Sequence, residues 1–148
     1  MWRPLLASVL SLSVAACSSE SEPEGASAVL YGDATVTLAV EVADSPAERE
    51  QGLMGRTSIA PDAGMVFRFD RPTTTAFVMR DTTIPLSIAF YDRRGTITRI
   101  LDMDPCRAEP CRLYLPRTAY VGALEVLQGA FPRFGVQEGD RIEVTSGG

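Results

Sequence analysis

The chain has 148 residues, a formal net charge of −5 at pH 7 and no histidine. Its acidic balance argues against nucleic acid as a partner, because nucleic-acid-binding domains carry a basic patch or stripe. The absence of histidine excludes Ser-His-Asp and Cys-His hydrolysis and any zinc site built on histidine. Composition therefore removes several common functions before any motif is considered.

The N-terminal segment has the features of an export signal. Arg3 supplies one positive charge, and residues 5–14 form an apolar run that is too short to span a bilayer. Two alanines then lead directly to Cys17, an arrangement that resembles a bacterial lipoprotein signal. The resemblance implies cleavage of residues 1–16 and lipid attachment at Cys17. The alternative is an ordinary signal peptide followed by a chance cysteine.

A lipid on Cys17 would make the membrane itself a partner of the protein. We expect an exported lipoprotein of the bacterial cell envelope, facing the periplasm or the cell surface. Residues 17–33 begin with a stretch rich in Ser, Glu, Pro and Gly, so we expect a flexible, lipid-attached tether there. Residues 34–146 are then left for one folded domain.

The cysteine count predicts one disulfide. If Cys17 carries lipid, Cys106 and Cys111 remain as a pair outside the reducing cytosol. Their spacing differs from the C-x-x-C of thioredoxin-like redox sites, and two cysteines are too few for structural zinc. We therefore expect a small structural disulfide, with no metal and no cofactor.

The first element of the domain is predicted by alternation of apolar and polar residues. Valine or leucine occupies every second position of residues 35–42, which is typical of a half-buried strand. Ser45 then has the character of an N-cap, Pro46 suits the first helical position, and Glu48 completes a capping box. These residues predict a short helix that extends to about Met54.

Further strands are predicted between turn residues. They are residues 65–69, 74–79, 86–91, 96–101, 113–115, 119–127 and 141–144. Residues 129–136 suggest an irregular or short helical turn. Many short strands with only one clear helix predict a mainly β fold. We expect a single antiparallel β-sandwich or barrel-like domain with one short helix after the first strand.

Several segments occur in an order that resembles a known family. They are residues 52–56 (GLMGR), 64–69 (GMVFRF), 77–90 (FVMRDTTIPLSIAF), 124–126 (LEV) followed by Gly129, and 139–140 (GD). Together they are similar to the domain-of-unknown-function 192 family of bacteria and archaea, over about Val36 to Val144. The resemblance implies a compact, mainly β, sandwich-like fold and no established activity. Members of that family often carry export or lipoprotein signals.

The central motif departs from the family's usual pattern at four positions. Val78 stands where the family usually has Trp, Arg80 where it has Lys, Asp81 where it has Asn, and Ser87 where it has Asp. If the family shares a pocket at these positions, its polarity is altered in this chain.

Five polar residues form the candidate ligand-binding site: Arg56, Arg80, Asp81, Thr82 and Glu125. Arginine is suited to holding a carboxylate or phosphate, and carboxylates accept protons or hydroxyl groups. The alternative is structural: Arg56 and Glu125 would form an internal salt bridge between the helix end and the sheet.

Two functions from different classes follow. The first is a non-catalytic binding domain for a small polar molecule, a glycan or a protein of the cell envelope. The second is a glycosidase-like hydrolase in which Asp81 and Glu125 act as the two carboxylates. A third interpretation is a copper(I) site formed by methionines, namely Met54, Met65, Met79 and Met103. Their apolar neighbourhoods favour core packing instead.

Overall fold

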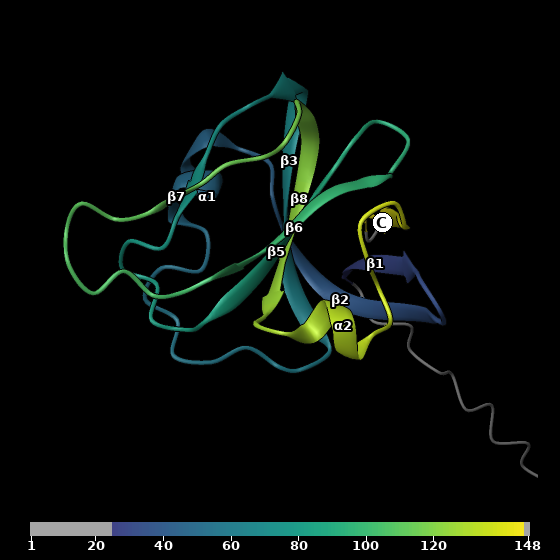
Figure 1. Cartoon of the computed structure of the whole chain (residues 1–148), viewed down its shortest axis with the longest axis horizontal. Helices are drawn as coiled ribbons and strands as arrows, with labels where there is room; N and C mark the ends of the chain where they lie inside the picture. The colour runs from purple at the N-terminus through teal and green to yellow at the C-terminus, as the bar shows by residue number, and fades with distance from the viewer. Residues whose placement is uncertain (1–24, 147–148) are drawn as a thin grey trace, which may run out of the picture.

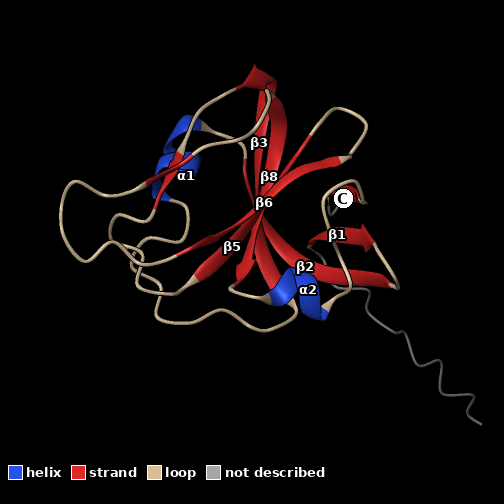
Figure 2. Ribbon diagram, in the orientation of Figure 1, coloured by secondary structure: helices blue, strands red, loops and turns tan. Residues whose placement is uncertain are grey.

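The computed structural model describes residues 25–146, so Cys17, the expected signal segment and residues 17–24 of the expected tether lie outside the described residues. The strands are β1 (Ala26–Tyr31), β2 (Thr35–Ala43), β3 (Ala63–Thr73), β4 (Phe77–Val78), β5 (Leu86–Tyr91), β6 (Ile97–Met103), β7 (Leu113–Tyr114), β8 (Tyr120–Leu127) and β9 (Arg141–Thr145). The helices are α1 (Pro46–Gln51) and α2 (Ala130–Arg133). The mainly β class expected from the sequence is confirmed (Figures 1 and 2).

A seven-stranded sheet, in the order β6-β5-β8-β3-β2-β1-β9, organises the described residues. Most neighbouring strands are antiparallel, but β2 and β3 run parallel, so the sheet is mixed and not antiparallel throughout. A parallel pair needs a crossover connection, and the segment that contains α1 supplies it. A second, two-stranded sheet pairs β4 with β7.

The large sheet curls until its two outer strands approach each other (Figure 2). Thr96, just before β6, bridges to Arg141 at the start of β9. The Ile97 backbone N–H donates to the Asp140 carbonyl at 2.8 Å, and the Ile142 N–H donates to the Gly95 carbonyl at 2.8 Å. The domain is therefore a curled half-barrel, and the barrel-like expectation describes it better than the sandwich.

Two features near the N-terminus differ from the sequence analysis. Residues 26–31, which the sequence analysis assigns to the tether, form β1, which pairs with β2 on one side and β9 on the other. The helix consequently follows the second strand and not the first. Small residues dominate the start of β1, so its order comes from pairing on both edges and from burial of Ala28 and Leu30.

Helix α1 begins where the sequence predicts. The Glu48 backbone N–H donates to Ser45 Oγ at 3.2 Å, and the Ser45 N–H donates to Glu48 Oε2 at 2.9 Å, which completes the capping box. The helix ends at Gln51, earlier than the expected Met54, because Gly52 takes a φ of 44°.

Each face of the sheet buries its own apolar cluster. One cluster includes Leu38, Leu124 and Phe131. The other includes Phe67, Met79 and Tyr120, with Phe77 packed against it, and lies on the face that α1 and the small sheet cover. Alternation along β8 sends Leu124 to the first cluster and Ala123 to the second. The functional site is on the second face.

Candidate functional site

Glu125 lies near the middle of β8 with its side chain on the face that α1 covers. Its register partners are Met65 on β3 and Ile88 on β5, both members of the second apolar cluster. Only 6 % of Glu125 is exposed. Burial raises the pKa of its carboxyl to about 8, and no hydrogen bond or neighbouring charge contributes to this shift. The carboxyl is therefore mostly protonated at pH 7.

A small pocket of about 40 Å³ opens onto this carboxyl. Its walls come from α1 and the turn after it, from β3, from β4 and from the loop after β4. The lining consists of Arg49, Glu50, Gln51, Gly52, Leu53, Met54, Phe67, Phe77, Val78, Met79, Thr82 and Glu125. No described side-chain nitrogen or oxygen is both sealed from solvent and unpaired. The Glu125 oxygens, which make no hydrogen bond, are therefore not fully sealed from solvent.

Two of the five expected site residues, Thr82 and Glu125, line this pocket together. Thr82 is 7 % exposed, and its hydroxyl donates to the Arg80 carbonyl at 3.2 Å. That bond uses the hydroxyl proton and leaves oxygen lone pairs to accept. Thr82 and Glu125 are thus the buried polar residues of a pocket whose wall also includes Arg49, Glu50 and Gln51.

Arg56 does not contact Glu125, so the expected internal salt bridge is wrong. Its guanidinium instead makes a bidentate pair with Glu41 on β2, with both N···O distances 2.6 Å. Both side chains are well exposed to solvent, and the pair lowers the pKa of Glu41. Arg56 is therefore a surface residue outside the pocket.

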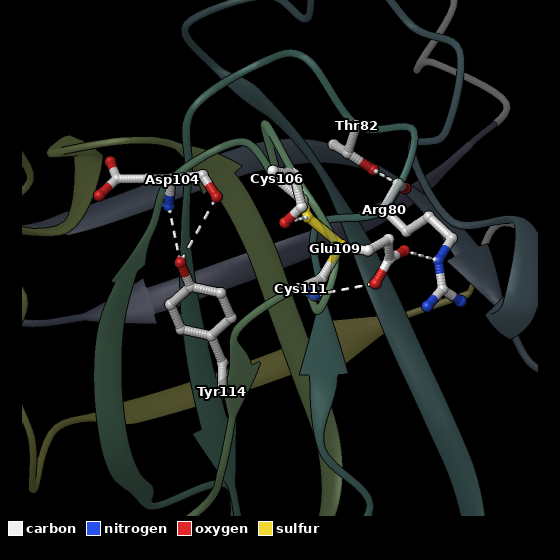
Figure 3. Close-up of a disulfide and its surroundings, with 8 residues drawn as sticks. Arg80, Thr82, Asp104, Cys106, Glu109, Cys111 and Tyr114 are labelled. Carbon is white, nitrogen blue, oxygen red and sulfur yellow. Dashed lines mark hydrogen bonds and ion pairs between the residues drawn. A yellow bond between two sulfur atoms is a disulfide. The ribbon is translucent and has the colours of Figure 1, made fainter.

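Arg80 also has a surface partner. Its Nε lies 2.8 Å from Glu109 Oε1 in the loop between Cys106 and Cys111 (Figure 3). Asp81 is exposed and has a left-handed backbone with φ 53°, and its carbonyl accepts from the Gly55 N–H at 2.9 Å. Neither residue lines the pocket, so the structure separates Asp81 from Glu125.

The expected disulfide between Cys106 and Cys111 is confirmed (Figure 3). Glu109 joins this loop internally as well, because its second carboxylate oxygen accepts from the Cys111 N–H at 2.9 Å. Tyr114 secures the chain before the loop, with its hydroxyl 3.0 Å from the Asp104 nitrogen. The loop and the segment around Arg80 are thereby fastened together.

A model of the DUF192 family, described as Uncharacterized ACR, matches residues 28–144. The chain belongs to this family. None of the curated proteins matches it. Two solved structures share its fold. A Sinorhizobium meliloti protein, described as a proposed transcription regulator, is 34% identical with a TM-score of 0.73, over 81% of this chain and 94% of that one. A Novosphingobium aromaticivorans protein of unknown function is 27% identical with a TM-score of 0.73, over 79% and 83% respectively.

The DUF192 motif segments converge on the Glu125 pocket. The segment 52–56 supplies Gly52, Leu53 and Met54 to its wall, and 64–69 supplies Phe67. The segment 77–90 supplies Phe77, Val78, Met79 and Thr82, and the segment 124–126 supplies Glu125. The sequence analysis missed the apolar members of this wall because they look like ordinary core residues. The order of the DUF192 motifs along the chain was the sequence signal that could have indicated these wall residues.

The methionines divide between the core and the pocket. Met65, Met79 and Met103 are buried in the second apolar cluster, as the sequence analysis favours. Met54 and Met79 also line the pocket. Within residues 25–146, no group of three or more Cys, Asp or Glu side chains is arranged to hold a metal ion.

Two larger clefts lie elsewhere on the described surface. The first, about 650 Å³, is lined by four arginines and four carboxylates, so its charges largely offset one another. The second, about 690 Å³, borders the disulfide loop near Tyr114. No helix formed by the described residues is both long and apolar enough to cross a membrane.

Proposed function

We propose that this protein is a non-catalytic ligand-binding domain whose binding site is the Glu125 pocket. The observation that carries the proposal is the Glu125 carboxyl, which is buried and unpaired yet open to a defined pocket. A polar group buried without a partner costs free energy. A ligand that supplied the missing partner would recover part of that cost, and a site of this kind is a common mark of function.

The composition of the pocket supports binding over two-carboxylate hydrolysis. That chemistry needs an acid and a second carboxylate on either side of the scissile bond. Asp81, the second carboxylate in that hypothesis, is exposed and does not line the pocket. The acid that does accompany Glu125 is Glu50, which is exposed at the mouth. We therefore assign Glu125 a role in recognition.

We further propose that the domain works at the cell envelope, held by lipid on Cys17. Two observations support this location: the lipoprotein-type signal that precedes Cys17, and the Cys106–Cys111 disulfide. Disulfides persist outside the reducing cytosol. Mass spectrometry of the protein purified from membranes tests the anchor. Intact mass should show residues 1–16 removed and Cys17 acylated, and a Cys17→Ser variant should leave the membrane fraction.

A thermal-shift screen of the full-length protein tests the binding function. Envelope sugars, peptides and metal ions are the natural panel, because a ligand of the native state raises the melting temperature by mass action. We expect at least one compound to stabilise the wild-type protein and to lose its effect on Glu125→Gln. Glu143→Gln, which removes an exposed carboxylate of β9, is the matched control and should keep the shift. A shift retained in full by Glu125→Gln would place the site elsewhere.

A further inference from the structure

The pocket around Glu125 has acceptors to offer, and several of its donors are already used. Gln51 Nε2 donates to the Met54 carbonyl at 3.2 Å, and Thr82 Oγ1 donates to the Arg80 carbonyl. Arg49 Nη1 donates to the carbonyls of Asp44 and Arg68, the latter at 2.8 Å. A ligand that complements the free acceptors of this pocket must bring donors of its own.

Three backbone N–H groups of the pocket wall are likewise already hydrogen-bonded. The Gly52 N–H donates to the Glu48 carbonyl at 2.8 Å, and the Met54 N–H donates to Gln51 at 3.0 Å. The Thr82 N–H donates to the Met79 carbonyl at 3.3 Å. These bonds engage three N–H groups of the wall that could otherwise hold an anion. The carbonyl end of α1 also faces the site, where partial negative charge favours a cation.

Aromatic rings complete a surface suited to positive charge. Phe67 and Phe77 both line the pocket and meet edge to face, with ring centroids 4.9 Å apart. The faces of aromatic rings attract cations, most strongly where water is excluded. The charged groups that line the pocket with Glu125 are Arg49 and Glu50. Two backbone carbonyls already accept from Arg49 Nη1, and the guanidinium lies 4.8 Å from the centroid of Phe69, so part of its binding capacity is used.

The volume of the pocket limits what can enter. A space of roughly 10–15 Å³ holds one water molecule by the same measure, so a pocket of about 40 Å³ admits a small group such as an ammonium with the methylene beside it. A quaternary ammonium has no N–H to donate to Glu125 or Thr82. A primary ammonium has three donors and no acceptor, which matches the acceptors of Glu125 and Thr82.

We infer that the pocket binds a primary ammonium group on an unbranched aliphatic chain, forming an ion pair with Glu125. The inference rests on the proposed function and names its ligand class. The ammonium enters charged, and Glu125 gives up its proton to the solvent, so the pocket gains one ion pair and the buffer gains one proton.

Calorimetric titration of the full-length protein with n-butylammonium at pH 7 tests the inference. We expect saturable 1:1 binding, with close to one proton released per bound amine, read from the dependence of the heat on the buffer. n-Butanol, which has a similar shape and no charge, should bind at least about tenfold more weakly, because hydrogen bonds to charged groups are the stronger ones. Tetramethylammonium should bind more weakly than n-butylammonium, because it has no N–H to donate to Glu125 or Thr82.

Three variants locate the site. Glu125→Gln should weaken n-butylammonium binding by about tenfold or more and abolish proton release. Thr82→Val, which keeps the side-chain shape, should weaken binding by several-fold. Glu143→Gln should bind as the wild type does. A lysine-containing peptide titrated beside the free amine distinguishes a protein ligand from a small molecule, since tighter binding of the peptide would indicate contacts beyond the pocket.

Two results would overturn the inference. One is equal affinity for n-butanol and n-butylammonium, and the other is undiminished amine binding by both Glu125→Gln and Thr82→Val. An uncharged ligand that needs Glu125 while the amine fails to bind would remove the ammonium inference and leave the proposed function standing. If neither amines nor any panel compound binds, both are wrong.

Discussion

Arg56 and Glu41 form a two-pronged ion pair on the surface, with each guanidinium nitrogen 2.6 Å from its own carboxylate oxygen. This pairing decides the state of Glu125, because it engages the arginine that the sequence offers as a partner for the buried carboxyl. Without that cation, Glu125 remains a protonated group in apolar surroundings. The pocket is therefore neutral when empty and can accept positive charge.

Removal of Arg56 should have a small effect on stability. Exposed ion pairs contribute about 0–1 kcal/mol, and both partners here are well exposed. We expect Arg56→Gln to lower the free energy of unfolding by less than about 1 kcal/mol in urea denaturation and to leave amine binding unchanged. Glu41→Gln should match it. A loss of binding in Arg56→Gln would show that Arg56 belongs to the site after all.

Glu125 should make stability fall as the pH rises. Its pKa is about 8 in the folded chain against 4.5 for an exposed glutamate, so between these values the folded chain holds a proton that the unfolded chain has lost. The contribution is fully present below pH 4.5 and is lost as the pH rises to about 8. Relative to Glu125→Gln, we expect the wild type to lose on the order of 4 kcal/mol across this window.

Urea denaturation of both proteins at several pH values between 4 and 9 measures this difference. Subtraction of the Glu125→Gln curve removes the titration of all other groups that the two proteins share. Glu143→Gln, which also lacks one carboxylate, controls for the change in net charge. A wild-type minus Glu125→Gln difference that stayed constant with pH would show that the carboxyl is not desolvated in the folded protein.

Ser45 should stabilise the domain through the start of α1. Its hydroxyl accepts from the Glu48 N–H, and loss of such an N-cap costs about 1 kcal/mol. We expect Ser45→Ala to lower the free energy of unfolding by about that amount, measured by urea denaturation. Ser58→Ala, at an exposed position in the loop after α1, should change it little. Equal effects of the two substitutions would contradict a capping role.

The Cys106–Cys111 disulfide should stabilise the loop it closes. The chain-entropy model gives about 2 kcal/mol for so short a loop. We expect the double variant Cys106→Ser/Cys111→Ser to unfold at a lower denaturant concentration by that margin, and dithiothreitol to reproduce the effect in the wild type. Because neither cysteine lines the Glu125 pocket, amine binding should survive. If reduction abolished binding, the loop would have to shape the pocket through Arg80 and Glu109.

Local sequence patterns predict much of the fold. Alternation in residues 35–42 predicts β2, where Leu38 and Val40 are buried between exposed neighbours. The capping box predicts the start of α1, and the cysteine count predicts the disulfide. These features rest on contacts within a few residues, or on parity, so the sequence contains all that is needed to infer them. The motif order likewise led to the DUF192 family.

Long-range pairing accounts for what the sequence analysis missed. β1 depends on β2 and β9, and the parallel pairing of β2 with β3 depends on the crossover that contains α1. No local pattern encodes either arrangement. One strand is also shorter than the sequence predicts. The β-prone segment 74–79 forms only the two-residue strand β4, which pairs with β7.

The same division between local sequence patterns and long-range contacts applies to the candidate site. The sequence alone determined that Glu125 alternates with apolar neighbours in a strand and that Thr82 follows an apolar motif. Only the tertiary structure decided that Glu125 faces inward beneath α1, that Thr82 lies beside it in one pocket, and that Arg56 and Arg80 are held by Glu41 and Glu109. The physical reason is that burial and ion pairing depend on which segments meet in space. Strand periodicity places a side chain on a face, and packing determines what covers that face.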